Sequence, residues 1–356
     1  MTRPGRGGAG EEVGGARLVL LGTAGGPLPS PVRSGIAQAL VAGGGTYLLD
    51  CGTGVTRQLR RARLLASLRR VLVTHLHSDH TCDLFDVFLL GWPVLQWNPP
   101  VVVHGPGPAG GAGALPAAEP GRAGGLVAPH APTPGLVEHL DACFAAHAYD
   151  LNLRVRDSGR RDLRDLVRPQ ELPVPPGAQG PAEVAPDIDP FAVFEDDHVR
   201  VSATLVHHAP VFPAYAFRLD TDDGSVVVSG DTAPCENLVR LARGADVLVH
   251  EVYDDTGLGP AAAEPPAGDD EDEPGDDPWE ARRRHHHLVT SHTALGEVGR
   301  VAAAAGVGRL VLTHFVPGDD TIPDEHWVAG AGRDYDGEVV VGHDLLELPL
   351  RTPVAW

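Results

Sequence analysis

Seven residues, THLHSDH at positions 74–80, constrain the fold of this chain more than any other part of its sequence. They place three imidazoles and a carboxylate directly after an apolar run that predicts a buried strand. Polar groups this dense at a strand end are costly unless they are paired or bind an ion. Because alternate side chains of an extended segment face the same side, His75 and His77 can face one metal ion. Asp79 and His80, beyond the turn, can face a second, and this donor set suits Zn²⁺ and also Mn²⁺ or Fe.

Apolar runs typical of strands alternate with segments of helical periodicity along most of the chain. Strands or hairpins are predicted over 16–24, 38–50, 69–75, 101–105, 199–208, 214–231, 245–252, 309–315 and 337–348. Helices are predicted over 56–68, 81–92, 135–149, 235–244 and 293–307. Interleaved strands and helices favour an α/β chain whose sheets are covered by helices, with the motif-bearing loops at strand ends. Both halves end strands in His or Asp, which predicts two sheets presenting one shared edge.

Three segments depart from this pattern. Residues 1–15 are glycine-rich, lack the apolar stretch of a signal peptide and predict a disordered tail. Residues 106–198 are rich in Pro, Gly and Ala, which predicts a large, partly irregular insertion with one helix. Residues 256–284 carry an acidic run that predicts a solvated loop. We therefore expect a single domain over 16–350 that is interrupted by the insertion and the acidic loop.

Composition and charge narrow the classes of function. The net charge is −20 and every basic residue is arginine, which argues against a general nucleic-acid-binding face. The absence of an apolar run of about 18 residues predicts no transmembrane span and no membrane partner. The four cysteines form no C-x-x-C pair, which is typical of a reduced, cytoplasmic protein without disulfides.

Several motifs in this order resemble one family of hydrolases. H-x-H-x-D-H after an apolar strand resembles the signature of metallo-β-lactamase-fold hydrolases, and LLGTAGG (20–26) and LLDCGTG (48–54) resemble the two segments that precede it. Four later segments resemble one branch of that family, which contains ribonuclease Z, related phosphodiesterases and arylsulfatase-like hydrolases. These segments are SGDT (229–232), VHE (249–251), SHTALGEVGRVAAAAGV (291–307) and LTHFVPGD (312–319). The resemblance covers roughly residues 16–350. It implies a four-layer αββα sandwich, in which two mixed sheets are covered by helices.

The resemblance also implies a set of metal ligands for two divalent ions. The first ion would be held by His75, His77 and His208, the second by Asp79, His80 and His314, and both by Asp231. Adjacent strand residues point in opposite directions, so only one of His207 and His208 can be a ligand. The segment HAPVFPAYAFR resembles the family's segment after the ligand, which favours His208.

Three residues carry catalytic roles in the mechanism that the resemblance implies. A hydroxide bridging the two ions attacks the ester, and Asp79 orients it or accepts its proton. His250 donates a proton to the leaving group, and His292 contacts the phosphate at the start of a helix. The neighbouring tract His285 to His287 borders the acidic loop and is not assigned to the site.

The motifs leave more than one substrate class open. The first expectation is a hydrolase of small phosphodiesters or sulfate esters. The alternative is ribonuclease Z, which trims the 3′ end of tRNA precursors and carries a basic arm. The charge disfavours it, a tight hairpin alone joins His208 to Asp231, and arginines over 156–168 are spaced as a salt-bridged helix. A mononuclear iron oxygenase-type protein or a non-catalytic metal-binding scaffold is a further alternative, and a homodimer is expected from the resemblance alone.

Overall fold

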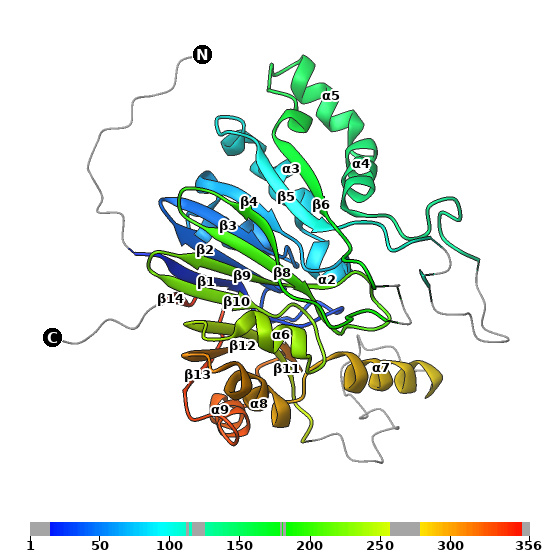
Figure 1. The fold of residues 1–356 in the computed structure, drawn as a ribbon. Helices are drawn as coiled ribbons and strands as arrows, with labels where there is room; N and C mark the ends of the chain where they lie inside the picture. The colour runs from blue at the N-terminus through cyan, green and yellow to red at the C-terminus, as the bar shows by residue number, and fades with distance from the viewer. Residues whose placement is uncertain are drawn as a thin grey trace.

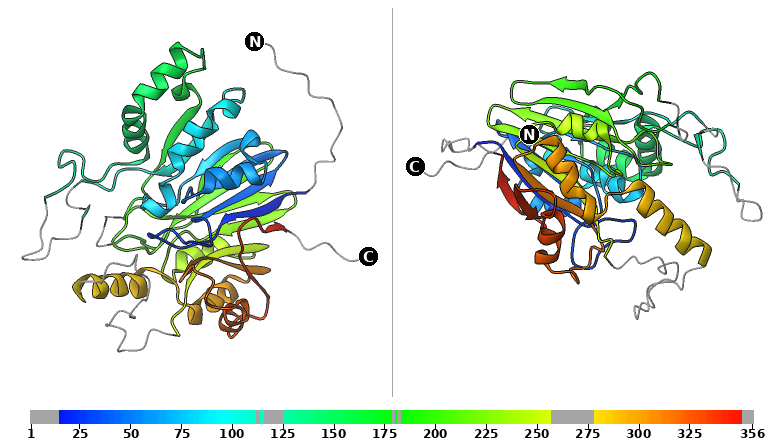
Figure 2. Two further views of the ribbon diagram at one scale, coloured as in Figure 1. Left: turned by 180° about the vertical axis from the view of Figure 1, so that it is seen from behind. Right: turned by 60° about the horizontal axis from the view of Figure 1, so that its bottom comes forward.

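Two mixed β-sheets organise the chain in the computed structural model, which describes residues 15–111, 114–115, 125–178, 180, 183–256 and 278–350. Within these residues each sheet has seven strands. One face of each sheet packs against the other sheet, and helices cover the two outer faces (Figure 1; Figure 2). This arrangement confirms the predicted αββα sandwich.

The first sheet has the strand order β14-β1-β2-β3-β4-β5-β6. Its strands are β1 (Arg17–Gly22), β2 (Ala37–Ala42), β3 (Gly45–Leu49), β4 (Leu68–Leu72), β5 (Val101–Pro106), β6 (Val167–Leu172) and β14 (Glu347–Pro349). The hairpin β2–β3 turns at Gly43 and Gly44, whose φ angles of 53° and 69° favour glycine. From β3 to β6 the neighbouring strands are parallel, so their carboxyl ends lie at one edge of the sheet.

The second sheet has the order β13-β12-β11-β10-β9-β8-β7. Its strands are β7 (Phe191–Glu195), β8 (Arg200–Leu205), β9 (Tyr215–Thr221), β10 (Gly224–Val228), β11 (Val247–Tyr253), β12 (Arg309–Val316) and β13 (Glu338–Val341). Strands β7 to β10 are antiparallel and β10 to β13 are parallel. The predicted terminal strand 337–348 is therefore two strands that belong to different sheets.

Helices lie on both outer faces of the sandwich (Figure 1). The α-helices of the described residues are α1 (Val55–Arg61), α2 (Ser78–Thr81), α3 (Leu84–Leu95), α4 (Leu136–Ala146), α5 (Ala148–Arg156), α6 (Glu236–Ala242), α7 (Pro278–Ser291), α8 (Leu295–Ala305) and α9 (Asp324–Ala331), of which α7 projects from the side of the sandwich (Figure 1). The alternation of side chains along buried strands separates the apolar layers. In β1, Leu18 packs between the sheets and Val19 packs in the cluster that contains α1 and α3. In β11, Val249 packs between the sheets and Leu248 packs in the cluster that contains α6 and α8.

The segment 106–198 contains more regular structure than its composition predicted. It holds two helices, α4 and α5, instead of one, and its strands β6 and β7 extend the edges of the two sheets. The predicted helix over 156–168 is wrong, because α5 ends at Arg156 and Gly159 adopts a φ of 60°. Arg164 instead pairs with Asp162 across 2.7 Å at a one-turn 3₁₀ helix.

The acidic loop ends earlier than its charge predicted. Residues 278–284 belong to α7, which starts with a proline at the first helical position and continues through good helix formers. Residues 1–14 of the predicted tail and residues 257–277 of the predicted loop lie outside the described residues. Among the helices that the structure describes, none combines the length and the apolar character needed to cross a membrane.

Candidate metal centre

The THLHSDH segment crosses the carboxyl edge of the first sheet. It leaves β4 after Leu72, runs through an extended stretch and begins α2 at Ser78. His75 and His80 are completely buried, whereas His77 and Asp79 are partly exposed. This local path turns polar side chains of one short segment into the sandwich.

Three further residues reach the same edge from the second sheet. His208 follows β8, Asp231 follows β10 and His314 lies near the end of β12. All three are buried. The pairing of β11 with β12 shifts at His314, and such a bulge redirects a side chain at a strand end.

One group of possible ligands consists of the following residues, whose ligand atoms all lie within 4.8 Å of one another: His75, His77, His208 and Asp231. His77 Nδ1 lies 3.3 Å from His208 Nε2. Asp231 Oδ2 lies 3.8 Å from His75 Nε2 and 3.9 Å from His208 Nε2. Two donors bound about 2.1 Å from one tetrahedral zinc ion are themselves about 3.4 Å apart, so the spacing fits a cation.

A second group meets the same criterion and contains Asp79, His80, Asp231 and His314. Asp231 Oδ1 lies 3.2 Å from His80 Nε2 and 3.4 Å from His314 Nε2. Asp79 Oδ2 lies 3.4 Å from His314 Nε2. Asp231 therefore presents one carboxylate oxygen to each group, which is the arrangement that a bridging ligand requires.

Unpaired polar atoms support the same interpretation. His75 Nε2, His80 Nε2 and Asp231 Oδ1 are buried without a hydrogen-bond partner. A buried polar atom left unsatisfied costs about 1–3 kcal/mol, so three of them in one cluster point to a missing partner. Burial lowers the pKa values of His75 and His208 well below the ordinary range, which keeps both imidazoles neutral. The cluster therefore fits divalent cations.

Two carboxylates outside the two groups that share Asp231 in this way orient histidines at the site, and the sequence analysis assigned a role to neither. Asp50 accepts hydrogen bonds from the backbone N–H and the hydroxyl of Thr74, and its Oδ2 lies 2.9 Å from His80 Nδ1. Despite burial, Asp231 and Asp50 raise the pKa of His80. Glu251 Oε2 lies 2.7 Å from His292 Nδ1. Partners of this kind fix the tautomer and orientation of metal-binding histidines.

Backbone geometry at the centre is unusual at two of these positions. Asp50 and His314 have φ angles of 57° and 49°, in the left-handed region that side-chain-bearing residues rarely adopt. Such conformations persist where the surrounding structure over-determines them, and they cluster at functional sites.

Glycines next to the motif permit close approach of the backbone. A Cβ atom at Gly26 would lie 2.3 Å from Cβ of Asp79, and one at Gly52 would lie 2.6 Å from the Asp79 carbonyl oxygen. No side chain fits at these distances. The glycines of the LLGTAGG and LLDCGTG segments therefore allow two loops to hold Asp79.

Of the two histidines predicted to be catalytic, His292 lies at the centre and His250 does not. His292 lies in a group with Asp231, Glu251 and His314, although α8 starts later, at Leu295. His250 belongs to none of the ligand groups within the described residues. Its Nδ1 lies 2.7 Å from the Glu251 carbonyl oxygen. Because neighbouring residues of β11 face opposite sides, Glu251 rather than His250 meets the centre.

His287, which the sequence analysis left outside the site, lies against it. Its ring centroid is 5.1 Å from that of His208, 5.2 Å from that of His292 and 6.0 Å from that of His77. His287 lies four residues before Ser291, whose carbonyl oxygen contacts His208, and residues four apart share a helix face. The spacing from His287 to Ser291 and His292 was the signal available in the sequence.

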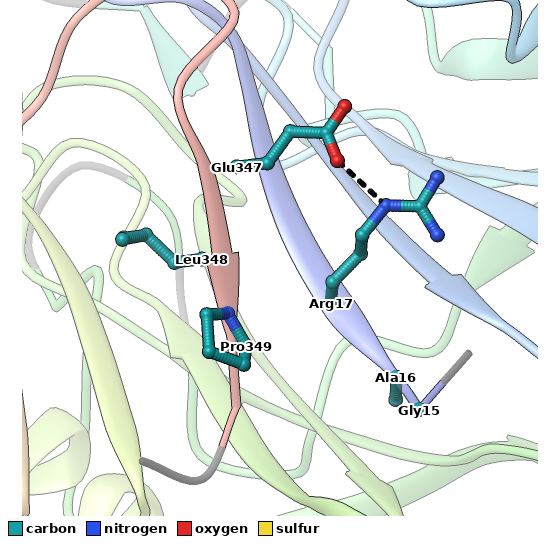
Figure 3. A pocket seen from close by; sticks show the side chains of 6 residues that line it. All are labelled: Gly15, Ala16, Arg17, Glu347, Leu348 and Pro349. Carbon is teal, nitrogen blue, oxygen red and sulfur yellow. Dashed lines mark hydrogen bonds and ion pairs between the residues drawn. The ribbon is translucent and has the colours of Figure 1, made fainter. Parts of the chain in front are cut away.

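Two cavities differ in their relation to the centre. One, of about 280 Å³, is lined by Leu76, His77 and residues of the loop 210–213. The other, of about 310 Å³, is lined by residues 15–17 at the start of β1 and by β14, and Arg17 and Glu347 on its wall pair across 2.8 Å (Figure 3). Only the first shares a residue with the ligand groups described above.

Comparison with known proteins agrees with this geometry. The family model of the metallo-beta-lactamase superfamily matches residues 27–283. The chain therefore belongs to the metallo-β-lactamase superfamily, and it is a metal-dependent hydrolase by this fold and family. Within it, ribonuclease Z of Mycobacterium bovis (strain BCG / Pasteur 1173P2) is 32% identical over 334 residues, which cover 92% of this chain and 96% of the relative. Ribonuclease Z of Mycobacterium avium (strain 104) is 32% identical over 343 residues, which cover 94% and 99%.

Solved structures share the fold at lower identity. Human tRNase Z, short form, has a TM-score of 0.58 at 20% identity and covers 94% of this chain and 100% of its own. The metallo-beta-lactamase fold protein YhfI from Bacillus subtilis has a TM-score of 0.57 at 16% identity, with coverage of 94% and 98%. These likenesses show the fold and carry no substrate.

Proposed function

We propose that this chain is a ribonuclease Z-type endonuclease that cleaves a phosphodiester bond at the 3′ end of tRNA precursors with two Zn²⁺ ions. The observation that carries the proposal is Asp231, which offers one oxygen to each of two complete ligand groups. Relatives named ribonuclease Z, at 32% identity over more than nine-tenths of the chain, supply the substrate class. They favour the ribonuclease Z alternative over the small-ester substrate that the sequence analysis placed first.

The donor set favours zinc, with Mn²⁺ or Fe as alternatives. His75, His77 and His208 would hold the first ion, Asp79, His80 and His314 the second, and Asp231 both. When bound, such a pair of ions supplies hydroxide at neutral pH and stabilises the negative charge of the phosphate oxygens.

The chain's own groups position the reactants. Asp79 Oδ2 lies 3.4 Å from His314 Nε2 and 3.6 Å from His80 Nε2. Burial raises the pKa of Asp79, but the hydrogen bond from His314 and the charges of His80 and His314 together lower it below its ordinary value. Asp79 therefore stays ionised and can accept a proton from the attacking water. Glu251 holds Nδ1 of His292, which leaves Nε2 to contact a phosphate oxygen or the leaving group. We therefore assign proton donation to His292 in place of His250.

A small phosphodiester or sulfate ester is the second candidate substrate. The net charge of −20 and the short connection between β9 and β10, which replaces an inserted arm, both favour it. A cytoplasmic location and a homodimer stay predictions.

The test offers the full chain a precursor tRNA with a 3′ trailer, beside bis-p-nitrophenyl phosphate and an aryl sulfate. We expect one cut at the end of the acceptor stem, loss of cleavage on chelation and recovery with Zn²⁺. Metal analysis should give two ions per chain. Hydrolysis of the small esters with an intact precursor would contradict the proposal and support the second candidate.

A further inference from the structure

The cavity of about 280 Å³ beside His77 has walls from distant parts of the chain. It is lined by Leu76 and His77, by the loop 210–213 that follows His208, and by residues of the segment 107–134, among them Gly107, Ala109 and residues 132–134. His77 belongs both to this cavity and to the first ligand group. The cavity therefore adjoins the first ligand group, within reach of a molecule whose charged part lies there.

The lining selects an uncharged, flat group. Prolines at 132, 134, 210 and 213 and the ring of Phe212 line it, together with small aliphatic side chains. Thr133 is a polar member, and its hydroxyl oxygen already accepts a hydrogen bond of 2.9 Å from the Gly111 N–H. The volume lies just below the range of about 300–1,000 Å³ that drug-sized ligands need, so it suits one ring system.

We propose that this cavity binds the nucleobase of one nucleotide next to the scissile phosphate, with the base stacked on Phe212. The assignment rests on the proposed function, because it requires RNA as the substrate. A phosphodiester held at the ligand groups carries a nucleoside on each side, and the shared residue His77 places the cavity beside one of them. Bases that are out of the helical stack pack on aromatic side chains in many RNA-binding sites.

The same lining predicts that the cavity does not distinguish bases. Hydrogen bonds to base edges carry sequence recognition, whereas stacking on an aromatic ring accepts every base. Purines and pyrimidines at the bound position should therefore be cleaved with similar kcat/KM, within about threefold, and removal of the base should matter more than its identity.

The experiment combines a substrate change with a protein change. Precursors carrying an abasic nucleotide immediately 5′ or immediately 3′ of the scissile phosphate are cleaved by wild type, Phe212→Leu and Phe212→Ala. Phe212→Leu keeps most of the volume and guards against a folding defect in Phe212→Ala. Trp97→Leu is the matched control, because Trp97 is 61% exposed just beyond α3 and does not line the cavity.

For wild type and Trp97→Leu we expect one of the two abasic positions to lower kcat/KM by ~10-fold or more. For Phe212→Leu the same abasic substrate should lose less than about threefold, because the stacking partner is already gone. Equal losses in wild type and Phe212→Leu, or no loss at either position, would overturn this assignment alone. An enzyme that hydrolyses bis-p-nitrophenyl phosphate but leaves every RNA intact would overturn the proposed function, and the assignment with it.

Discussion

The two halves of the metal centre are assembled in different ways. In the first sheet, one short segment after β4 carries His75, His77, Asp79 and His80. In the second sheet, each proposed ligand comes from a different strand end or bulge, so its place depends on the register of β8, β10 and β12. A local segment can hold ligand spacing through its own backbone, whereas the second half exists only once the sheet has formed.

Asp231 joins the two halves, so its substitution should have the largest effect. Asp231→Asn keeps the size of the side chain and removes the charge that faces both ligand groups. We expect loss of both ions and a fall in kcat of at least ~100-fold, because weakening only an outer partner of a ligand already costs about 10–100-fold. Metal analysis of the purified variant and single-turnover cleavage measure the two effects.

His80→Ala sharpens the same prediction, since His80 serves only the second group. This variant should keep one ion and still lose turnover. Full activity with a single ion would show that the two groups do not act together. Retention of both ions by Asp231→Asn would show that the aspartate does not bridge them.

Substitutions of Asp50 and Glu251, the carboxylates that hold His80 and His292, should affect metal binding and turnover separately. Asp50→Asn places an amide against the N–H of His80 and weakens a ligand of the first-sheet half. It should lower metal affinity by about 10–100-fold. Glu251→Gln loosens His292, which is not needed to complete either of the two four-residue ligand groups that share Asp231, so kcat should fall while both ions remain. Competition with a chromogenic chelator gives the metal affinity. Loss of metal affinity in Glu251→Gln, with loss of kcat alone in Asp50→Asn, would show that the roles of the two carboxylates are the reverse of those proposed.

The same contrast explains what the sequence predicted. Short apolar runs alternating with helical segments predicted sheets covered by helices, because buried strands and amphipathic helices leave different patterns, and the resemblance to the family implied the four-layer sandwich. Strands β6 and β7 were missed because their exposed edges interrupt that pattern with residues such as Pro169 and Glu195. The helix predicted over 156–168 failed because charge spacing was weighed above the turn at Gly159.

At the site, the residues of THLHSDH were predicted from their own pattern, His208, Asp231 and His314 only from the resemblance, and the carboxylates that hold the histidines were not predicted. Asp50, just after β3, and Glu251, inside β11, look like ordinary residues until the fold brings His80 and His292 to them. The choice of His250 over Glu251 required knowing which face of β11 meets the centre. That strand is buried throughout, so no alternation of polar and apolar residues marks the face.

A smaller effect on stability and metal binding is expected from adding a methyl group where the backbone at Gly26 packs against Asp79. Gly26→Ala puts a methyl group 2.3 Å from Cβ of Asp79, which forces the loop or the motif to move. Such overpacking costs about 1–3 kcal/mol of stability. We expect a lower Tm and weaker binding of the second ion, measured by calorimetry and metal titration. Gly125→Ala is the control, since its new methyl group meets nothing within 4 Å, and equal Tm values for both variants would contradict the prediction.

The smallest effect should come from His287, which the second half of the chain adds to the centre through α7. His208 faces His77 with Nε2 and the Ser291 carbonyl with Nδ1, so it has no nitrogen left for a further ion. Nδ1 of His292 is held by Glu251, and Nε2 of His292 is the atom proposed to contact the substrate. His287→Ala should therefore leave the metal content unchanged and lower kcat/KM by about 10-fold or less, which corresponds to at most ~1.4 kcal/mol.

His286→Ala is the matched control for this last prediction, because His286 is exposed on the same helix and belongs to none of the ligand groups. Its kcat/KM should equal that of wild type. Loss of an ion from His287→Ala would make His287 a ligand and extend the fold-dependent half of the centre by one residue. Equal kinetics for the two variants would instead mean that α7 contributes only packing, and that the strand ends alone build that half.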